Sequence, residues 1–206
     1  MSFTAGQRFA RLVTDAVVRR PRLWRLFRGP FRRMFDGLAP VWDSTRVSPA
    51  HLAPLEAAFE RVPTPPGRIL DVGTGSGAAA RAAARRWPDA EVVGVDLSAR
   101  MVEEARRNAT SERERYEVAD ASALPFADGS FDLVAQLNAI PFFDELARVT
   151  APGGRVVVAF SRGAATPIWV PLERVRQELA RRGFDGFEEI AGGAGRALLA
   201  VRGRVS

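Results

Sequence analysis

The chain has 206 residues, 47% of them hydrophobic, and a formal net charge of +6 at pH 7. This length suits one α/β domain with a sizeable core and a short appended segment. The chain has no cysteine and a single histidine, His51, which excludes disulfide scaffolds, thiolate zinc sites and multi-histidine metal centres, so we expect no metal. All 30 basic side chains are arginines, which excludes lysine Schiff-base chemistry and the lysine-dependent nucleoside triphosphate loop.

The positive charge lies at the N-terminal end. Residues 1–46 carry ten arginines and three acids, whereas the remaining 160 residues carry 20 arginines and 21 acids. A nearly neutral body offers no basic face along which a nucleic acid could continue, so we do not expect a nucleic-acid partner. No apolar run reaches the roughly 20 residues that span a bilayer, and arginines interrupt every early apolar stretch, so we expect a cytoplasmic protein.

The N-terminal segment shows helical periodicity. One apolar stripe spaced as on a helix is formed by Phe9, Leu12, Val13, Ala16 and Val17. Pro21 and the pair Gly29-Pro30 predict breaks that leave short helical pieces at 22–28 and 31–39. The proline-rich stretch 61–67 predicts a hinge, so we divide the chain into a basic helical arm or lid, 1–60, and a body, 61–206.

The body alternates between short β-branched runs and helical patterns, which is typical of βαβ units. The predicted helices are 77–87, 98–109 and 171–183, and the predicted strands are 68–73, 91–96, 115–120, 131–137, 155–160, 184–190 and 197–203. Three glycines at 192, 193 and 195 predict a hairpin between the last two strands. We therefore expect a Rossmann-like α/β fold with seven mostly parallel strands, helices on both faces and an antiparallel last strand.

A glycine-rich turn follows the first predicted strand. Residues 69–77 read ILDVGTGSG, and they would lie at the carboxyl edge of the sheet, where open α/β sheets bind ligands. A dinucleotide fingerprint can be written with Gly73, Gly75, Ala78 and Asp96. Asp71 favours a different ligand, because an acid beside the cleft opposes a pyrophosphate but suits an ammonium group and a sulfonium centre.

Four stretches, in order, resemble class I S-adenosylmethionine-dependent methyltransferases of the methyltransferase-11-like group, which includes ubiquinone and menaquinone biosynthesis enzymes. They are LDVGTGSG, VVGVDLSARMVEEAR, VADASALPFADGSFDLV and ELARVTAPGGRVVVAF. The resemblance covers roughly residues 35–203 and includes the entry segment with Trp42 and Asp43. It departs from that group in 138–154, which is shorter than in the quinone-biosynthesis enzymes. The resemblance therefore gives only weak support for the same substrate in this chain.

The resemblance implies an S-adenosylmethionine site. Asp96 would accept hydrogen bonds from both ribose hydroxyls, Leu97 and Met101 would pack on the adenine, and Asp120 with the backbone of Ala121 would read its amino edge.

The resemblance also implies contacts with the methionine part of the cofactor. The loop residues Gly73, Thr74, Gly75 and Gly77 would approach it, Asp71 would orient its amino end, and Asn138 would contact either it or the substrate.

The implied activity is methyl transfer to a small acceptor, at oxygen or carbon rather than nitrogen, because 138–143 lacks the usual amine-methylation motif. No catalytic residue is assigned, and we interpret His51 as a surface or helix-terminal histidine. The alternatives are a nicotinamide-dependent oxidoreductase and a non-catalytic S-adenosylmethionine-binding domain.

Two uses are open for the aromatic and basic arm. It could lie peripherally on an anionic membrane and deliver a lipophilic acceptor, or it could pack on the body as a lid, which we favour. The oligomeric state is left open.

Overall fold

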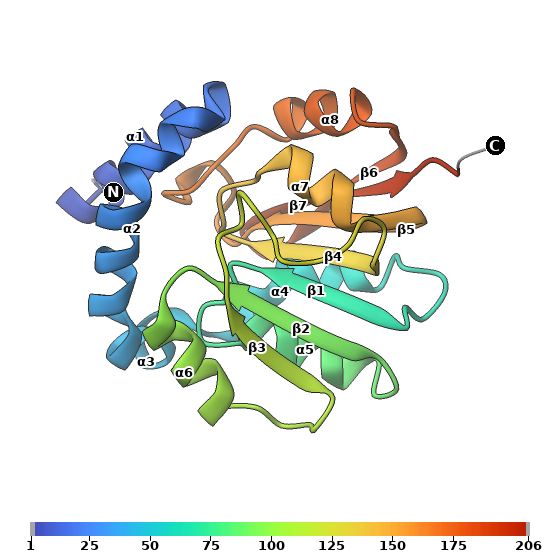
Figure 1. Ribbon diagram of the computed structural model, residues 1–206, viewed down its shortest axis with the longest axis horizontal. Coiled ribbons are helices and arrows are strands. Elements are labelled where there is room, and N and C mark those ends of the chain that lie inside the picture. Colours follow the sequence, from blue (N-terminus) through green and yellow to red (C-terminus); the bar gives the residue numbers. More distant parts are fainter. Residues whose placement is uncertain (1–2, 205–206) are drawn as a thin grey trace.

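Seven strands form one sheet in the order β3-β2-β1-β4-β5-β7-β6 in a computed structural model that describes residues 3–204 (Figure 1). The strands are β1 (Arg68–Val72), β2 (Glu91–Asp96), β3 (Glu114–Val118), β4 (Phe131–Leu137), β5 (Thr150–Phe160), β6 (Phe184–Gly192) and β7 (Gly195–Arg202). β1 to β5 pair in parallel, and β7 is antiparallel to both β5 and β6. The predicted sheet and its antiparallel last strand are confirmed.

Helices cover both faces of the sheet, which explains why its strands are almost continuously apolar. One core cluster joins the sheet to α4 (Pro49–Phe59), α5 (Ala78–Arg86) and α6 (Ala99–Arg107). A second cluster on the other face joins it to α7 (Phe143–Val149) and α8 (Leu172–Ala180). Three of these helices, α5, α6 and α8, were predicted from the sequence. Ser98 caps α6, since its side chain accepts from the Met101 N–H.

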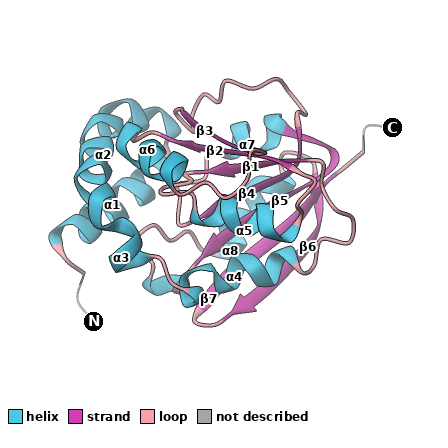
Figure 2. Ribbon diagram, turned by 90° about the horizontal axis from the view of Figure 1, so that it is seen from below, coloured by secondary structure: helices cyan, strands magenta, loops and turns pink. Residues whose placement is uncertain are grey.

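The N-terminal arm gathers at one end of the molecule (Figure 2). It contains α1 (Ala5–Arg19), a short 3₁₀ turn (Pro21–Leu23), α2 (Trp24–Leu38), a second 3₁₀ turn (Ala39–Val41) and α3 (Trp42–Arg46). The predicted break at Pro21 is confirmed.

The predicted break at Gly29-Pro30 is wrong, because α2 runs through Pro30 without interruption. An interior proline costs about 3 kcal/mol of helix stability. Here Trp24 and Phe31, which lie on one side of α2, are buried in a third apolar cluster together with Ile140, Phe142 and Ile168. Burial of two large aromatic side chains, at roughly 1.5–3 kcal/mol each, offsets that cost.

The boundary between arm and body at residue 60 stays a prediction. α4, which that division assigns to the arm, packs on the sheet at β5, β6 and β7. Its residues Leu52, Leu55 and Phe59 belong to the same core cluster as the strands. The segment that lies over the strand ends is therefore α1 to α3.

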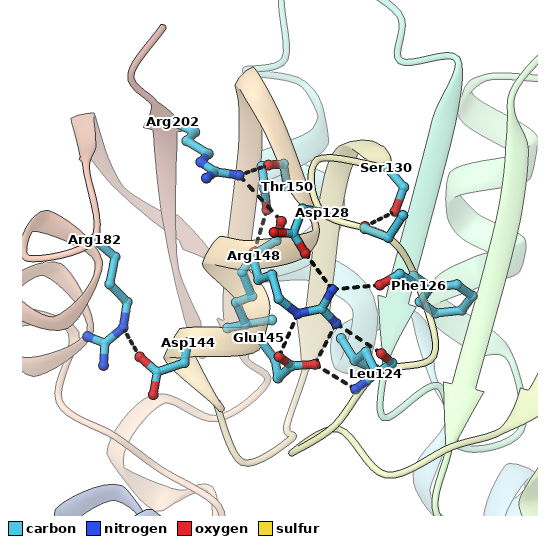
Figure 3. A network of polar contacts seen from close by, with 12 residues as sticks. Leu124, Phe126, Asp128, Ser130, Asp144, Glu145, Arg148, Thr150, Arg182 and Arg202 are labelled. Atoms are coloured by element: carbon cyan, nitrogen blue, oxygen red, sulfur yellow. Dashed lines mark hydrogen bonds and ion pairs between the residues drawn. The ribbon is translucent and has the colours of Figure 1, made fainter. Parts of the chain in front are cut away.

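The connection between β3 and β4 is held to α7 by one arginine (Figure 3). The Arg148 guanidinium donates to the carbonyls of Leu124 at 2.9 Å and Phe126 at 2.6 Å, and it pairs with Asp128 at 2.9 Å and Glu145 at 2.7 Å. Glu145 in turn accepts from the Leu124 N–H at 2.6 Å. These bonds fix the segment that carries Asp120 and Ala121 toward the site.

Candidate functional site

A cleft of about 890 Å³ lies at the carboxyl ends of β1, β2, β4 and β5. Its floor is the glycine turn after β1 and the first residues after the other strands. Its remaining walls come from α1, α2, α3, the first turn of α4 and the segment 166–168 after β5, so the arm forms part of the cleft. This volume lies within the range of about 300–1,000 Å³ that is usual for small-molecule and cofactor sites.

The glycine turn is shaped by backbone bonds and by close neighbours. The N–H groups of Gly73 and Thr74 both donate to the Val95 carbonyl, at 2.8 and 2.9 Å, which ties the turn to β2. Gly73 has a φ of 73°, and a Cβ there would lie 2.7 Å from the Ala139 Cβ. A side chain at this position would therefore be strained and would collide with the opposite wall.

The Asp96 carboxylate lies at the end of β2 and lines the cleft. Its Oδ2 accepts from the Gly75 N–H and its Oδ1 from the Ser98 N–H, both at 2.9 Å. Burial raises the pKa of Asp96 to about 6, although these backbone hydrogen bonds oppose the shift. Each oxygen keeps acceptor capacity for a second donor, as a pair of ribose hydroxyls would require.

Asp71 lies beneath the turn and does not line the cleft. Its Oδ2 accepts from the Thr74 hydroxyl at 2.6 Å, whereas Oδ1 is buried without a hydrogen-bond partner. Burial raises the pKa of Asp71 to about 6, and the Thr74 hydrogen bond opposes the shift. Thr74 does line the cleft, so Asp71 reaches the site through that hydroxyl.

Only some of the residues that were predicted to contact the adenine line the cleft. Leu97 and Ala121 line the cleft, but Met101 is fully buried below it. Asp120 is bound by the arm, because its Oδ1 accepts from the Trp24 Nε1–H at 2.8 Å. Its Oδ2 lies 3.9 Å from a guanidinium nitrogen of Arg28, which lies one helical turn after Trp24 in α2.

Of the remaining predicted residues, Gly75 and Asn138 line the cleft and Gly77 does not. A Cβ at Gly77 would lie 2.9 Å from the Tyr116 hydroxyl oxygen, so this glycine serves packing between turn and sheet. Asn138 has a φ of 55° and is tied to the end of β5: its Oδ1 accepts from the Ser161 N–H and its Nδ2 donates to Ser161 Oγ, both at 2.9 Å.

The sequence reasoning assigned no cofactor or substrate contact to an aromatic wall that the arm contributes to the cleft. The rings follow one another along the wall at centroid distances of 5.4 Å (Trp24–Phe31), 5.0 Å (Phe31–Phe35) and 5.6 Å (Phe35–Trp42). All four residues line the cleft. The aromatic spacing of the arm was visible in the sequence, but it did not show which surface the rings would face.

His51 also lines the cleft, from the first turn of α4. Burial is the main reason why its pKa lies below 6.5, and the positive charges of Arg162 and Arg46 lower it further. The imidazole is therefore neutral at pH 7. No sequence pattern links these three residues, which come from α4, from the segment after β5 and from α3.

Comparisons with known proteins agree with this geometry. Residues 69–154 match a family described as methyltransferase domain. The chain is 40% identical over 137 residues to malonyl-[acyl-carrier protein] O-methyltransferase of Halorhodospira halophila, covering 62% of this chain and 46% of the relative. It is also 40% identical over 141 residues to demethylmenaquinone methyltransferase of Thermus thermophilus, covering 61% of this chain and 63% of the relative.

Among solved structures, Haemonchus contortus phosphoethanolamine N-methyltransferase 2 in complex with S-adenosyl-L-methionine superposes with a TM-score of 0.62 at 19% identity, covering 81% of this chain and 60% of that one. At this identity the likeness shows the fold. The chain covers less than two thirds of the length of either curated relative. Together these findings agree with the predicted resemblance to class I S-adenosylmethionine-dependent methyltransferases: residues 69–154 match a methyltransferase domain family, the relatives are methyltransferases, and the fold is that of a solved methyltransferase.

Proposed function

We propose that the chain catalyses methyl transfer from S-adenosylmethionine to a small acceptor. The observation that carries the proposal is the half-buried Asp96 carboxylate, which lines the cleft and is held beside the glycine turn by the Gly75 N–H at 2.9 Å. This arrangement provides an acceptor for ribose hydroxyls next to a turn whose backbone a ligand can approach closely. The buried Asp71 below the same turn disfavours a pyrophosphate, and with it the nicotinamide alternative.

The proposed contacts start from the lining of the cleft, where Asp96 would bind the ribose and Leu97 and Ala121 would lie against the adenine. Asp120 does not line the cleft and is bound by Trp24, so the predicted contact of its carboxylate with the adenine amino group would require that hydrogen bond to open. The predicted packing of Met101 on the adenine would be indirect, because Met101 is fully buried.

The methionine part would rest on the glycine turn. Gly73, Thr74 and Gly75 line that end of the cleft, with Asn138 opposite, whereas Gly77 and Asp71 would act from behind the turn. The bound cofactor supplies an electrophilic methyl group. The chain would then align the acceptor and exclude water, for which an aromatic wall contributed by the arm is suited.

The same aromatic wall and the names of the relatives support a proposal for the chemical class of the acceptor. Oxygen or carbon methylation fits the names of the two curated relatives, one an O-methyltransferase of a malonyl carrier protein and the other a demethylmenaquinone methyltransferase. The four aromatic rings favour an acceptor with a flat apolar part.

Peripheral contact of the N-terminal arm with the inner, cytoplasmic face of the membrane remains a separate proposal. None of the helices within residues 3–204 has the length and apolarity to cross a bilayer. The apolar stripe of α1 and α2 packs inward, with Val13, Val17 and Trp24 buried, which favours the lid. Leu12 and Leu26 remain exposed among arginines. Equal sedimentation with anionic liposomes for the full chain and a form lacking residues 1–33 would remove the membrane proposal.

Thermal denaturation tests the proposed function. S-adenosylhomocysteine at 100 times its dissociation constant should stabilise the full chain by about 2.7 kcal/mol, whereas NAD should have no effect. The reverse result would favour the oxidoreductase. Turnover of S-adenosylmethionine with quinol and carboxylate acceptors then separates an active enzyme from a domain that only binds the cofactor, with Asp96→Ala as the inactive control.

A further inference from the structure

The charges along the cleft are unequally distributed between its two ends. Asp96 is the acidic residue that lines it, at the end of β2. Three arginines also line it, and one of them, Arg32, lies 3.8 Å from the carboxylate of Asp36. The ion pairs within residues 3–204 include neither Arg46 nor Arg162. Arg46 and Arg162, the two arginines that act on His51 at one end of the cleft, therefore have no carboxylate partner among the described residues.

Neutral donors surround these arginines. Ser161, which is 6% exposed, accepts from Asn138 Nδ2 at 2.9 Å, and no acceptor for its own O–H lies within the described residues. Ser48, Ala50 and His51 line the same end from the first turn of α4, whose N-terminus carries a partial positive charge. The charged groups that face His51 are Arg162 after β5 and Arg46 at the end of α3.

Resting on the proposed function, we propose that this end of the cleft binds the methyl acceptor as an oxyanion, with Arg46 and Arg162 as its ligands and Ser161 as a hydrogen-bond donor. Guanidinium groups bind carboxylates and other oxyanions through charge-assisted hydrogen bonds. An acceptor that brings its own negative charge would supply the partner that both arginines lack. It would also place an electron-rich oxygen beside the apolar wall.

His51 extends the same inference. When the oxyanion derives from a hydroxyl group, the proton passes to the neutral imidazole of His51 and from there to water. When the acceptor is already a carboxylate, no proton moves and His51 only borders the site. The two guanidinium groups disfavour an imidazolium, and the oxyanion that the proton transfer leaves beside them offsets this repulsion, so the transfer to His51 is favoured while the acceptor is bound.

Binding of small matched probes tests the proposal. The full chain is titrated with naphthoate, its uncharged amide naphthamide, and nitrophenolate, with and without S-adenosylhomocysteine. Naphthoate or nitrophenolate should bind at least about tenfold more tightly than naphthamide, since a charged hydrogen bond contributes roughly 1.5–3 kcal/mol. Preference for naphthoate identifies a carboxylate acceptor, and preference for nitrophenolate an ionised hydroxyl.

Variants assign the effect to residues. Arg162→Gln and Arg46→Gln should each weaken the preferred anion about tenfold and leave S-adenosylhomocysteine binding unchanged, which also shows that they fold. Arg33→Gln is the matched control, because Arg33 is an exposed arginine of α2 that does not line the cleft. Its affinity for the anion should stay within about twofold of the original chain.

His51 gives an independent reading, because it is the chain's one histidine and its NMR signal needs no assignment. The pKa of His51 should rise when the anion binds and should not change with naphthamide. If neither anion binds better than naphthamide, or if both arginine variants bind the anion normally, the inference is overturned. Failure of S-adenosylhomocysteine to bind would instead remove the proposed function, and the anion titrations without it would still decide this inference.

Discussion

The two ends of the cleft are built in different ways. At the cofactor end, the turn, Asp96 and the β3–β4 connection are held by backbone hydrogen bonds and by the Arg148 cluster, so their positions are fixed by the sheet. At the proposed acceptor end, the wall comes from the arm and from the segment after β5, and Arg46 and Arg162 have no carboxylate partner within residues 3–204. The proposed cofactor end is thus built mainly by the sheet, with Trp24 of the arm bound to Asp120, whereas the proposed acceptor end depends more on appended segments.

A substitution in the glycine turn should have the largest effect. Gly73→Ala would place a methyl group 2.7 Å from the Ala139 Cβ at a φ of 73°. We expect a loss of about 3 kcal/mol in unfolding free energy and loss of S-adenosylhomocysteine binding, measured by urea denaturation and calorimetry. Gly37→Ala in α2, where nothing lies within 4 Å, is the control and should be neutral or stabilising. Normal S-adenosylhomocysteine binding by Gly73→Ala would show that the glycine turn is not held rigidly at the cofactor end.

Removal of the Arg148 side chain tests whether the connection after β3 is held in the same rigid way. Arg148→Ala leaves the carbonyls of Leu124 and Phe126 and the Glu145 carboxylate without their shared donor, so we expect a loss of about 2–3 kcal/mol in urea denaturation. The exposed Arg115 serves for comparison, and Arg115→Ala should change stability by less than about 0.5 kcal/mol. Equal effects would show that the cluster is ordinary surface.

The buried Asp71 predicts a pH dependence. Its folded pKa of about 6 lies above the ordinary value of 3.8, so the folded state holds the proton more tightly and the free energy of unfolding falls as pH rises from about 4 to 6. Asp71→Asn removes this contribution. Relative to the original chain, its stability should rise by about 3 kcal/mol over that interval and stay level above it. Asp89→Asn, at an exposed site, should give a flat difference, and a flat difference for Asp71→Asn would refute the shift.

A substitution in the arm should lower the free energy of unfolding by less than the substitutions in the body. Trp24→Phe keeps an aromatic ring but removes the hydrogen bond to Asp120, which still accepts from the Ser122 N–H and hydroxyl. We expect a loss of about 1 kcal/mol and faster hydrogen exchange in α2. Leu26→Ala, on the exposed side of the same helix, should leave exchange unchanged. Unchanged exchange in Trp24→Phe would mean that this hydrogen bond does not hold the lid.

The same contrast explains what the sequence could predict. The first two strands, the glycine turn between them and Asp96 lie within residues 68–96, where strand and helix periodicity and turn chemistry act locally. The break at Gly29-Pro30 was mispredicted because the packing of Trp24 and Phe31 outweighs the local cost of proline.

Depth and distant contacts were not visible in the sequence. The positions of Asp71 and Met101 beneath the cleft follow from the packing of the whole domain. The acceptor end joins Arg46, His51 and Arg162 across more than a hundred residues, and no spacing rule connects them. The resemblance to methyltransferases predicted residues for the cofactor, and at this end it named Asn138 alone, as a contact of either the cofactor or the substrate.

The most direct test of the account is the affinity of S-adenosylhomocysteine, measured by calorimetry for three chains. The original chain should bind it, Asp96→Asn should bind it roughly a hundredfold more weakly because two charge-assisted hydrogen bonds are weakened, and Arg162→Gln should bind it as the original chain does. If Asp96→Asn binds normally, or if Arg162→Gln loses as much affinity as Asp96→Asn, the division of the cleft into a cofactor end and an acceptor end is contradicted.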